Sequence, residues 1–371
     1  MAEYSLYIDK NIKKETLNAI NKTYQVDAEM TIDVFDDAVV VPGNNGGLYK
    51  LCGEMVSDSS ILCQRTYPTS IDESITTVDE EVVYVGMWGA PWGHCITDNL
   101  AHLWFLFDER CQYLKEKKWV YTLIWGDEVP NTFRALLKIY GVDMEDLYRV
   151  DKDTRFKKVC FPSACFKYHV DDMYYSYSKE FALFFDKINL PTPKLDLPTY
   201  DKIFFSRKQW DKRKERGEQH LEDAFKKMGY AILYPEKMSL EEQIYTIRHC
   251  KCLAVTEGSV AHNAIFLERG SKLVVIRKAY YINAYQYPIN EMRGLRVFLI
   301  DSHKSVCVNR IEPRHGPFFL YCSKNLKSFA NGIELGRFPF REFASYMMNN
   351  FAFCMRVILR KNWYKLTSNH I

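Results

Sequence analysis

The chain has 371 residues, of which 47% are hydrophobic and 26% are charged, and its formal net charge at pH 7 is +3. This small charge gives no support for nucleic-acid binding, and the sequence contains no run of about 18 apolar residues that would predict a membrane span. The length favours two domains, each with enough apolar residues for a core.

The start of the chain and the cysteines indicate a reducing compartment. The first residues lack the basic and apolar regions of a signal peptide. The eleven cysteines are scattered, and Cys250 and Cys252 form a CxC rather than a zinc-binding CxxC. We therefore expect a cytoplasmic protein whose cysteines are reduced.

The first residues suited to chemistry follow a predicted strand at 81–88 and a loop rich in Gly and Trp at 89–93. Helical spacing then places His94, Asp98 and His102 on one face of a predicted helix. A carboxylate four residues from a histidine can orient the imidazole and raise its basicity, or accept the proton itself. The pair His94 and Asp98 is therefore a candidate general base.

Other interpretations of these polar residues stay open. Thr97 or Asp98 could simply cap the start of the helix. With His102 as a third ligand the same face could hold a metal, although no Glu accompanies the pair as in HExxH. Farther along, Asp151 and Asp153 form an Asp-x-Asp that could bind a divalent metal, but their charged surroundings favour a solvated turn.

A Pro-rich stretch at 190–198 separates two predicted domains. Before it, a strand at 118–125 and an amphipathic helix at 131–140 indicate a first α/β domain. After it, strands and helices alternate in the order that produces a parallel sheet with right-handed crossovers. The predicted strands of this second domain are 200–206, 231–234, 253–255 and 272–276, and its helices are 218–228 and 239–250. No GxGxxG follows any of these strands, which disfavours a dinucleotide-dependent dehydrogenase.

Basic residues follow the predicted strand 200–206 directly. Arg207 stands closest to the strand end, at the edge of the sheet where α/β proteins bind ligands, and Arg213 comes soon after it. A guanidinium suits phosphate because it stays charged and can bond two oxygens. A solvated charge run is the expectation for the neighbouring Lys208, Lys212 and Lys214.

The turn Glu257-Gly258-Ser259 joins the predicted strand 253–255 to a predicted helix that begins at Val260. Backbone N–H groups at a helix start, together with a glycine that permits close approach, suit such a turn to a phosphate. The same residues could form a plain strand-to-helix turn.

The tail from Phe343 to Ile371 contains no Asp or Glu, and its apolar residues recur at helical spacing. Such a basic amphipathic helix could lie on an anionic membrane surface. It could also dock back onto the protein with its basic residues in water, which is the interpretation that we favour.

Three segments in this order resemble glycosyltransferase family 61, which includes capsular polysaccharide enzymes and xylosyl- and O-GlcNAc-transferases. Gly93-His-Cys-Ile-Thr-Asp-Asn-Leu100 is similar to the His-x-x-x-Asp helix of the family, and Phe204-Phe-Ser-Arg207 is similar to its apolar-Ser-Arg strand end. The third segment, Glu257-Gly-Ser-Val-Ala-His-Asn263 preceded by Ser239-Leu-Glu-Glu-Gln243, is similar to its His-Gly-Ala-x-x-x-Asn segment. The resemblance extends from residue 85 to about residue 278.

The resemblance implies an α/β chain of GT-B-like architecture, with an interdomain cleft between two Rossmann-like domains. Residues 1–190, joined by a C-terminal helix at 340–371, would form the acceptor-side domain. Residues 199–339 would form the nucleotide-sugar-binding domain. The family transfers sugars from nucleotide donors, typically UDP-sugars, with inversion and without a catalytic metal. No cofactor is therefore expected beyond the nucleotide-sugar co-substrate.

The resemblance also implies roles for individual residues. Asp98 would act as the base with His94 as its partner, although the two roles could be exchanged. The residues expected to bind the donor are Arg207, Arg213, Glu257, Gly258, Ser259, His262 and Asn263. Glu257 stands where the family often has His, which suggests a different contact there, such as one to sugar hydroxyls. His262 is nearby but does not occupy the same position.

The sequence therefore predicts an inverting hexosyl- or pentosyltransferase that acts on an oligo- or polysaccharide acceptor. We expect a role in surface or capsular polysaccharide synthesis in the cytoplasm, at the inner face of the membrane. One alternative is a non-catalytic nucleotide-sugar or glycan-binding protein on the same fold. A second is a metal-dependent transferase that uses Asp151 and Asp153, and a third is a peripheral membrane scaffold.

Overall fold

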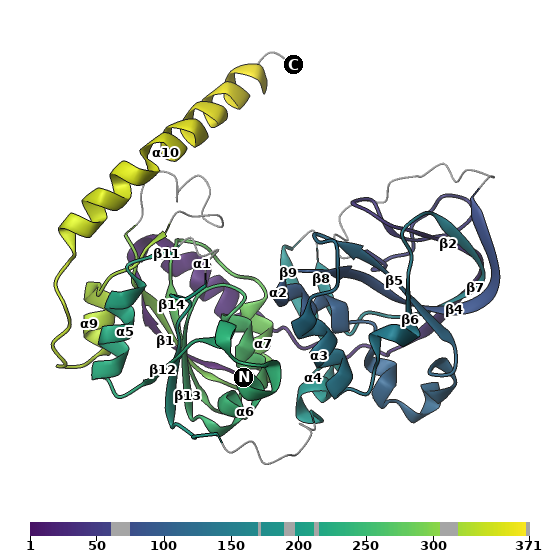
Figure 1. Cartoon of the computed structure of the whole chain (residues 1–371), viewed down its shortest axis with the longest axis horizontal. Helices are drawn as coiled ribbons and strands as arrows, with labels where there is room; N and C mark the ends of the chain where they lie inside the picture. The colour runs from purple at the N-terminus through teal and green to yellow at the C-terminus, as the bar shows by residue number, and fades with distance from the viewer. Residues whose placement is uncertain (61–74, 170–171, 189–196, 211–214, 305–317, 369–371) are drawn as a thin grey trace. The chain divides into compact units, whose positions relative to one another are not determined.

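The computed structural model describes residues 1–60, 75–169, 172–188, 197–210, 215–304 and 318–368 (Figure 1). The chain forms two compact α/β units. One, the mixed-sheet unit, is Thr23–Leu195, and the other, the parallel-sheet unit, combines Met1–Lys22 with Asp196–Ile371. The boundary falls inside the Pro-rich stretch, most of which lies outside the described residues.

The parallel-sheet unit contains a six-stranded sheet in the order β1-β15-β14-β13-β10-β12, and all neighbouring strands in it are parallel. Its strands are β1 (Glu3–Tyr7), β10 (Lys202–Phe205), β12 (Ala231–Leu233), β13 (Cys252–Thr256), β14 (Lys272–Arg277) and β15 (Arg296–Asp301). Strands buried on both faces read as continuous apolar runs, as β13 and β14 do. The strand and helix alternation predicted for residues 200–276 is confirmed.

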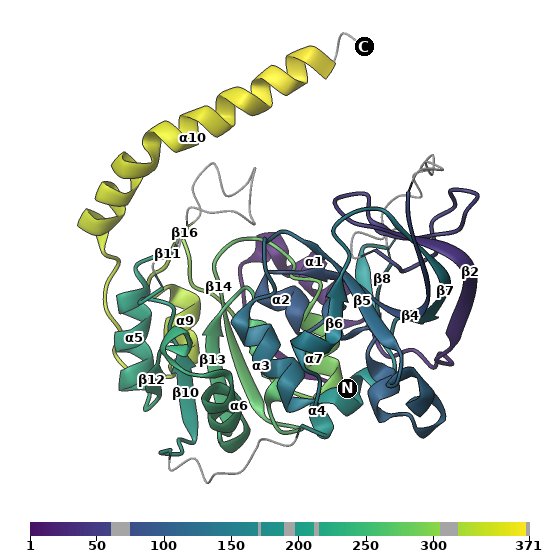
Figure 2. The same ribbon diagram turned by 45° about the vertical axis from the view of Figure 1, so that its right-hand side comes forward.

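Helices cover both faces of this sheet (Figure 1 and Figure 2). On one face, Phe225 of α5 and Leu326 of α9 pack against Phe204 and Val274 in a single buried cluster. On the other face lie α6, α7 and the 3₁₀ helix η6. The helices are α1 (Lys10–Ile20), α5 (Glu218–Lys227), η5 (Pro235–Lys237), α6 (Leu240–His249), η6 (Ala261–Phe266), α7 (Gln286–Met292) and α9 (Lys324–Phe329). A two-stranded pair, β11 (Glu215–Arg216) with β16 (Phe318–Phe319), completes the unit.

Local sequence explains where these helices begin. Ser239 caps α6 by accepting a hydrogen bond from the N–H of Glu242, whose carboxylate accepts the N–H of Ser239 in return. This reciprocal pair satisfies two backbone donors at the helix start and stabilises the start by about 1 kcal/mol.

The domain limits expected from the sequence differ from those of the structure at both ends of the chain. Residues 1–22 were expected with the acceptor-side domain, but β1 pairs with β15 in register from Glu3↔Arg296 to Tyr7↔Ile300. β1 and β15 lie at nearly opposite ends of the chain, so no local sequence pattern shows that they pair. The partner of β1 is fixed only when the sheet forms.

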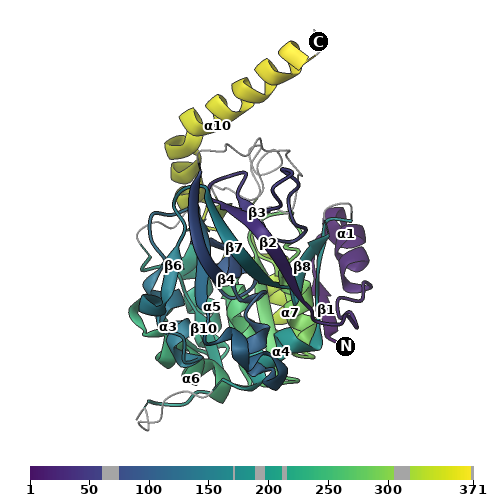
Figure 3. The same ribbon diagram turned by 90° about the vertical axis from the view of Figure 1, so that its right-hand side faces the viewer.

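The mixed-sheet unit contains a six-stranded sheet in the order β3-β2-β7-β4-β5-β6 (Figure 3). β4 is parallel to β5 and β7, whereas β2 is antiparallel to β3 and β7. The unit is therefore α/β, but its sheet is mixed. The sheet of a Rossmann-like domain would be wholly parallel. Its strands are β2 (Ile32–Val41), β3 (Gly47–Tyr49), β4 (Thr76–Gly89), β5 (Lys118–Ile124), β6 (Leu147–Arg149) and β7 (Thr154–Pro162), beside the hairpin β8 (Phe166–His169) and β9 (Tyr174–Tyr177).

Short helices follow the strands of this unit. They are α2 (Trp92–Cys95), η1 (Asp98–Leu100), η2 (Trp104–Phe107), η3 (Glu109–Leu114), α3 (Asn131–Ile139), η4 (Met144–Asp146) and α4 (Lys179–Asp186). The core contains Val82, Tyr84, Val120 and Phe156, which all have at most 1% of their surface exposed. Val82 and Tyr84 alternate along β4, so the side chain between them faces the opposite side of the sheet.

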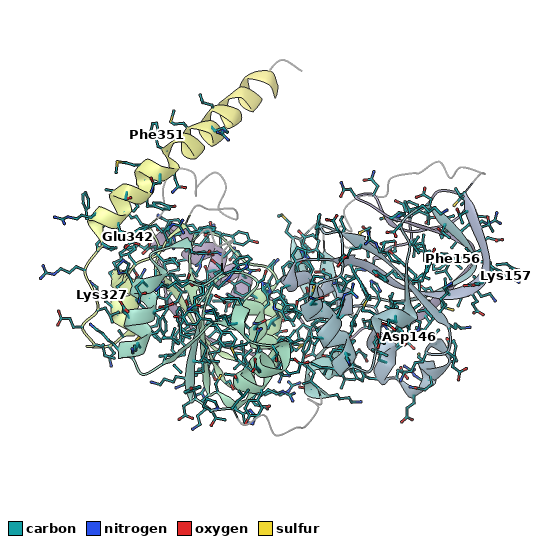
Figure 4. All side chains as sticks on the ribbon, in the orientation of Figure 1. Asp146, Phe156, Lys157, Lys327, Glu342 and Phe351 are labelled. Carbon is teal, nitrogen blue, oxygen red and sulfur yellow. The ribbon has the colours of Figure 1, made fainter. Side chains whose placement is uncertain are left out.

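The C-terminal helix α10 (Phe340–Ser368) begins on the parallel-sheet unit. Phe343 and Tyr346 pack around Phe319, and the Glu342 carboxylate lies 2.6 Å from His220 Nε2 (Figure 4). The expected attachment of this helix to the acceptor-side domain is therefore not found, because its first aromatic residues complete a cluster around β16. Among the described residues, no helix has the length and apolarity needed to cross a membrane.

Candidate active site

The carboxyl ends of three adjacent strands meet at one edge of the parallel sheet. Arg207 follows β10, the turn 257–259 follows β13, and Lys278 follows β14. Because neighbouring parallel strands lie about 4.8 Å apart, the residues that follow them are close in space. This edge is where open α/β sheets bind ligands.

Arg207 is held by contacts on both its main chain and its side chain. Its N–H donates to Glu218 Oε1 at 2.8 Å, and its guanidinium stacks over the Trp210 ring at 3.8 Å. Burial lowers the pKa of Arg207, and the carboxylates of Glu215 and Glu218 act in the opposite direction. An arginine remains charged under these conditions, so the stacked guanidinium is an oriented cation at the strand end.

Lys278 lies at the same edge and was missed by the sequence reasoning. Its Nζ lies 2.6 Å from Glu215 Oε1, and only 14% of its side chain is exposed. A Cβ placed on Gly258 would lie 3.4 Å from the same Nζ, so the lysine rests against the turn after β13. Burial alone would raise the pKa of Glu215, but Lys278 and Arg207 lower it below its usual range. The sequence could have indicated Lys278, since this residue follows a buried strand as directly as Arg207 does.

The predicted turn after β13 is present. Gly258 has φ of +130°, a backbone angle that residues with a Cβ rarely adopt, and both Gly258 and Ser259 are half-buried. The helix expected from Val260 is instead the six-residue 3₁₀ helix η6. A short 3₁₀ helix adds little dipole, so any anion site here depends on Arg207 and Lys278.

The Glu257 side chain is buried at this edge and interacts with Lys278. It is 93% buried and lines a cavity of about 10 Å³ with Arg277 and Gln286, on the face covered by α7. Burial raises the pKa of Glu257 to about 7, although Arg277 and Lys278 both lower it. The carboxyl group is thus partly protonated near neutral pH, in a position suited to internal packing.

His262 and Asn263 are also internal. His262 is 4% exposed, its Nε2 accepts a hydrogen bond from Asn283 Nδ2 at 3.1 Å, and its ring meets Tyr285 edge-on. Asn263 is 2% exposed within η6. The structure therefore brings Arg207, Gly258 and Ser259 together and places His262 and Asn263 in the packing beneath them. Arg213 lies outside the described residues, as do Lys212 and Lys214.

On the mixed-sheet unit, His94 and Asp98 form a pair. His94 Nδ1 lies 2.8 Å from Asp98 Oδ2, and the side chains are 22% and 12% exposed. The Thr97 hydroxyl lies 3.0 Å from the same carboxylate oxygen, and the His94 ring lies against Trp125 with 4.8 Å between centroids. The imidazole is therefore oriented from two sides and still reaches solvent.

The expected continuous helix through this pair is not found. α2 ends at Cys95, and Thr97 has φ of −126° and ψ of −89° before η1 begins at Asp98. The Asn99 side chain explains the break, because it bonds both the N–H and the C=O of Gly89 at 2.8 and 3.1 Å. This clamp fixes the Gly- and Trp-rich loop below the pair.

His102 does not join His94 and Asp98. It is 6% exposed, and its Nδ1–H donates to the Pro162 carbonyl at 2.7 Å. Burial lowers the pKa of His102, so the ring is neutral. Gly86 makes room for it, because a Cβ there would lie 2.7 Å from His102 Cδ2. The ring is thus a packed core residue and not the third ligand of a metal site.

The Asp-x-Asp is solvated, as its charged surroundings predicted. Asp151 is 67% exposed and forms an ion pair with Arg149, and Asp153 is exposed as well. Within the part of the chain that the structure describes, no three His, Cys, Asp or Glu side chains gather in a group that could hold a metal ion.

Comparison with known proteins gives the family. The family model described as Glycosyltransferase 61 matches residues 92–274, from the first residue of α2 into β14. This span includes His94, Asp98, Arg207 and the turn at Gly258. No curated protein matches the chain. The chain belongs to glycosyltransferase family 61, and it is a glycosyltransferase enzyme.

Proposed function

We propose that this enzyme transfers a sugar, with inversion, from a UDP-sugar to the hydroxyl of a glycan acceptor. The observation that carries the proposal is the cluster at the carboxyl edge of the parallel sheet, where Arg207 and Lys278 flank Gly258. Two cations beside a glycine turn suit a diphosphate, because the arginine can bond two oxygens and the lysine supplies a point charge. Uridine is the base typical of donors in this family.

The same two cations would stabilise the leaving group. When the anomeric carbon–oxygen bond breaks, negative charge develops on the departing diphosphate. Arg207 is pre-oriented by Trp210 and Lys278 by Glu215, so neither side chain has to reorganise as that charge develops. Fixed cations in this position would do the work that a divalent metal does in other transferases.

The proposed base is the His94–Asp98 pair. Inversion requires a base that takes the acceptor proton while the acceptor oxygen attacks the anomeric carbon from the side opposite the leaving diphosphate. Asp98 Oδ2 lies 2.8 Å from His94 Nδ1 and 3.0 Å from the Thr97 hydroxyl, so the carboxylate holds the imidazole in a fixed orientation. The pair then presents Nε2 of His94 as its basic atom, so the geometry favours His94 as the base and Asp98 as its partner.

The two parts of this proposal lie on different units. The donor residues belong to the parallel-sheet unit and the base to the mixed-sheet unit. This is the division of roles that the GT-B architecture assigns to its two domains.

A thermal-shift screen with UDP, GDP, CMP and their sugars, with and without EDTA, tests the donor site. We expect stabilisation by UDP and UDP-sugars that is unchanged by EDTA and lost in Arg207→Ala. Arg110→Ala is the matched control, since Arg110 is an exposed arginine far along the chain in the other unit. Stabilisation by no nucleotide, or equal stabilisation of Arg207→Ala, would exclude this site. Binding without any transfer or hydrolysis would favour the non-catalytic alternative.

We also propose that α10 brings the enzyme to an anionic membrane surface, where glycan assembly would place its acceptor. Beyond its docked first turns, Met348, Phe351 and Leu359 are 72%, 64% and 62% exposed. Their spacing sets them on one side of the helix, away from Phe343 and Tyr346. The helix has no acidic residue after Glu342, so its charge complements anionic lipid.

Flotation with vesicles tests this contact. The protein should bind vesicles that contain phosphatidylglycerol and not pure phosphatidylcholine, and Met348→Ser/Phe351→Ser/Leu359→Ser should not bind. Met173→Ser is the control, because Met173 is 66% exposed on the other unit. Unchanged binding by the triple variant would overturn the membrane contact. If the wild type forms dimers and the triple variant does not, the exposed side of α10 would be assigned to self-association instead.

A further inference from the structure

The amino edge of the parallel sheet carries an unusual row of charges. Lys202, Cys252, Lys272 and Arg296 are in register across β10, β13, β14 and β15. Residues in register on parallel strands point to the same face, so three cations share one face within four strands. Lys272 and Arg296 are immediate neighbours about 4.8 Å apart, an arrangement that like charges disfavour.

This row borders a cavity of about 620 Å³. Its apolar lining comes from Val274 and Tyr230 of the buried cluster under α5 and α9 and from the partly buried Phe298 and Phe329. Cavities of about 300–1,000 Å³ with apolar walls and a few polar groups are typical of small-molecule sites. The cavity is therefore large enough for a ligand of nucleotide or sugar-phosphate size.

Charges around the cavity are strongly unequal. Six Lys or Arg side chains line it, against two carboxylates, Asp201 and Glu268. Asp201 is already engaged, since it forms an ion pair with Lys251 at 3.0 Å. Lys202 and Arg296 donate instead to the carbonyls of Met228 and Gly270, which carry no net charge. Among the described residues, no ion pair holds Lys202, Lys272 or Arg296, although Glu3 of β1 is in register beside Arg296 and Glu268 lines the cavity.

We propose that this cavity is a second binding site, separate from the donor edge, for a phosphorylated small molecule. Its phosphate would lie between Lys272 and Arg296, and its less polar part would contact Phe298 and Phe329. The site cannot be an extension of the donor site. Lys272 and Lys278 are six residues apart along and just beyond β14, which at about 3.3 Å per residue is about 20 Å. No single diphosphate spans that distance.

Binding of inorganic pyrophosphate to full-length Arg207→Ala isolates this site from the donor edge. Isothermal titration should show one site, and Lys272→Gln/Arg296→Gln should weaken it by about tenfold or more, as expected when charge-assisted bonds are lost. Lys272→Arg should retain binding, and Lys237→Gln, an exposed lysine of the same unit outside the cavity, should leave it unchanged. A far-UV spectrum of each variant verifies that it is folded.

Two further ligands distinguish the sources of the phosphate. Tighter binding of a sugar 1-phosphate than of pyrophosphate would assign the site to a soluble phosphorylated sugar. Binding of vesicles with phosphatidic acid that depends on Lys272 and Arg296 would assign it to a lipid phosphate. No pyrophosphate binding by Arg207→Ala would overturn the proposal, as would equal affinity in Lys272→Gln/Arg296→Gln and Lys272→Arg. Neither result would bear on nucleotide binding at Arg207, so the proposal for this cavity and the proposal for the donor edge can be rejected separately.

Discussion

His94 Nδ1 lies 2.8 Å from Asp98 Oδ2, although the two residues do not share a continuous helix. An ionised carboxylate can only accept, so the ring must donate through Nδ1, and Nε2 then carries the basic lone pair. A base oriented by a carboxylate is the relationship found in catalytic triads. The pair is therefore suited to remove a proton from an acceptor hydroxyl.

Asp98→Asn should lower the transfer rate by about 10²–10⁴-fold, the usual contribution of general base catalysis. The amide keeps the shape of the carboxylate but neither stabilises an imidazolium nor fixes the correct tautomer. Donor affinity should not change, because Asp98 belongs to the other unit from Arg207. Asp146→Asn is the control, since Asp146 is an exposed carboxylate of the same unit (Figure 4). Normal turnover by Asp98→Asn, measured as kcat, would remove the pair from the mechanism.

Lys278→Ala should weaken UDP-sugar binding by about tenfold or more, through loss of a charge-assisted contact to the diphosphate. It should also destabilise the protein by about 3–5 kcal/mol, because it leaves the buried carboxylate of Glu215 without its partner. Lys278→Ala/Glu215→Gln separates the two effects. Thermal unfolding should show recovered stability in the double variant, while isothermal titration should still show weak binding. Wild-type affinity in the double variant would exclude Lys278 from the donor site.

Glu257→Gln should change how stability depends on pH. The pKa of Glu257 is about 7 in the folded protein against an ordinary value of 4.5, so the folded protein holds this proton more tightly than the unfolded chain does. The tighter binding of this proton adds about 3 kcal/mol to the free energy of unfolding. This contribution is complete below pH 4.5 and is lost as the pH rises through about 7.

Urea unfolding at pH 4.5 and pH 8 measures this effect. The free energy of unfolding of wild type should fall relative to that of Glu257→Gln by up to about 3 kcal/mol over this range. Glu236→Gln, at an exposed glutamate, should follow the wild type. Parallel pH dependence of wild type and Glu257→Gln would show that the Glu257 carboxyl group titrates normally.

Two glycines with nearly the same backbone angle should respond differently to alanine. Gly217, before α5, has φ of +83°, and a Cβ there would lie 2.0 Å from the Leu320 carbonyl oxygen. Gly229, after α5, has φ of +81° with nothing within 4 Å. Gly229→Ala should cost about 1 kcal/mol from backbone strain alone. Gly217→Ala should cost several times more, because main chain must move, and equal melting temperatures for the two variants would contradict this contact.

The sequence predicted the parallel sheet well because its information is local. Buried strands such as β13 and β14 are short apolar runs between turn residues, and Ser239 with Glu242 marks the start of α6. The positions of Arg207 and Gly258 at strand ends followed from the same pattern. Lys278 obeys this pattern too and could have been predicted by it.

What the sequence could not give depends on contacts between distant residues. The pairing of β1 with β15 and the antiparallel position of β2 are set by the whole sheet. The break in the helix after Cys95 depends on the hydrogen bond between Asn99 and Gly89, and local helix propensity does not indicate such a contact. Likewise, helical spacing predicted that His102 would join Asp98, but the Pro162 carbonyl holds it in the core.

Isothermal titration of Asp98→Asn and Arg207→Ala with a UDP-sugar tests the central claim most directly. If the carboxyl edge of the parallel sheet binds the donor and the His94–Asp98 pair performs the chemistry, Asp98→Asn should bind as wild type does and Arg207→Ala should bind at least about tenfold more weakly. Wild-type affinity in Arg207→Ala would contradict the assignment of the donor site.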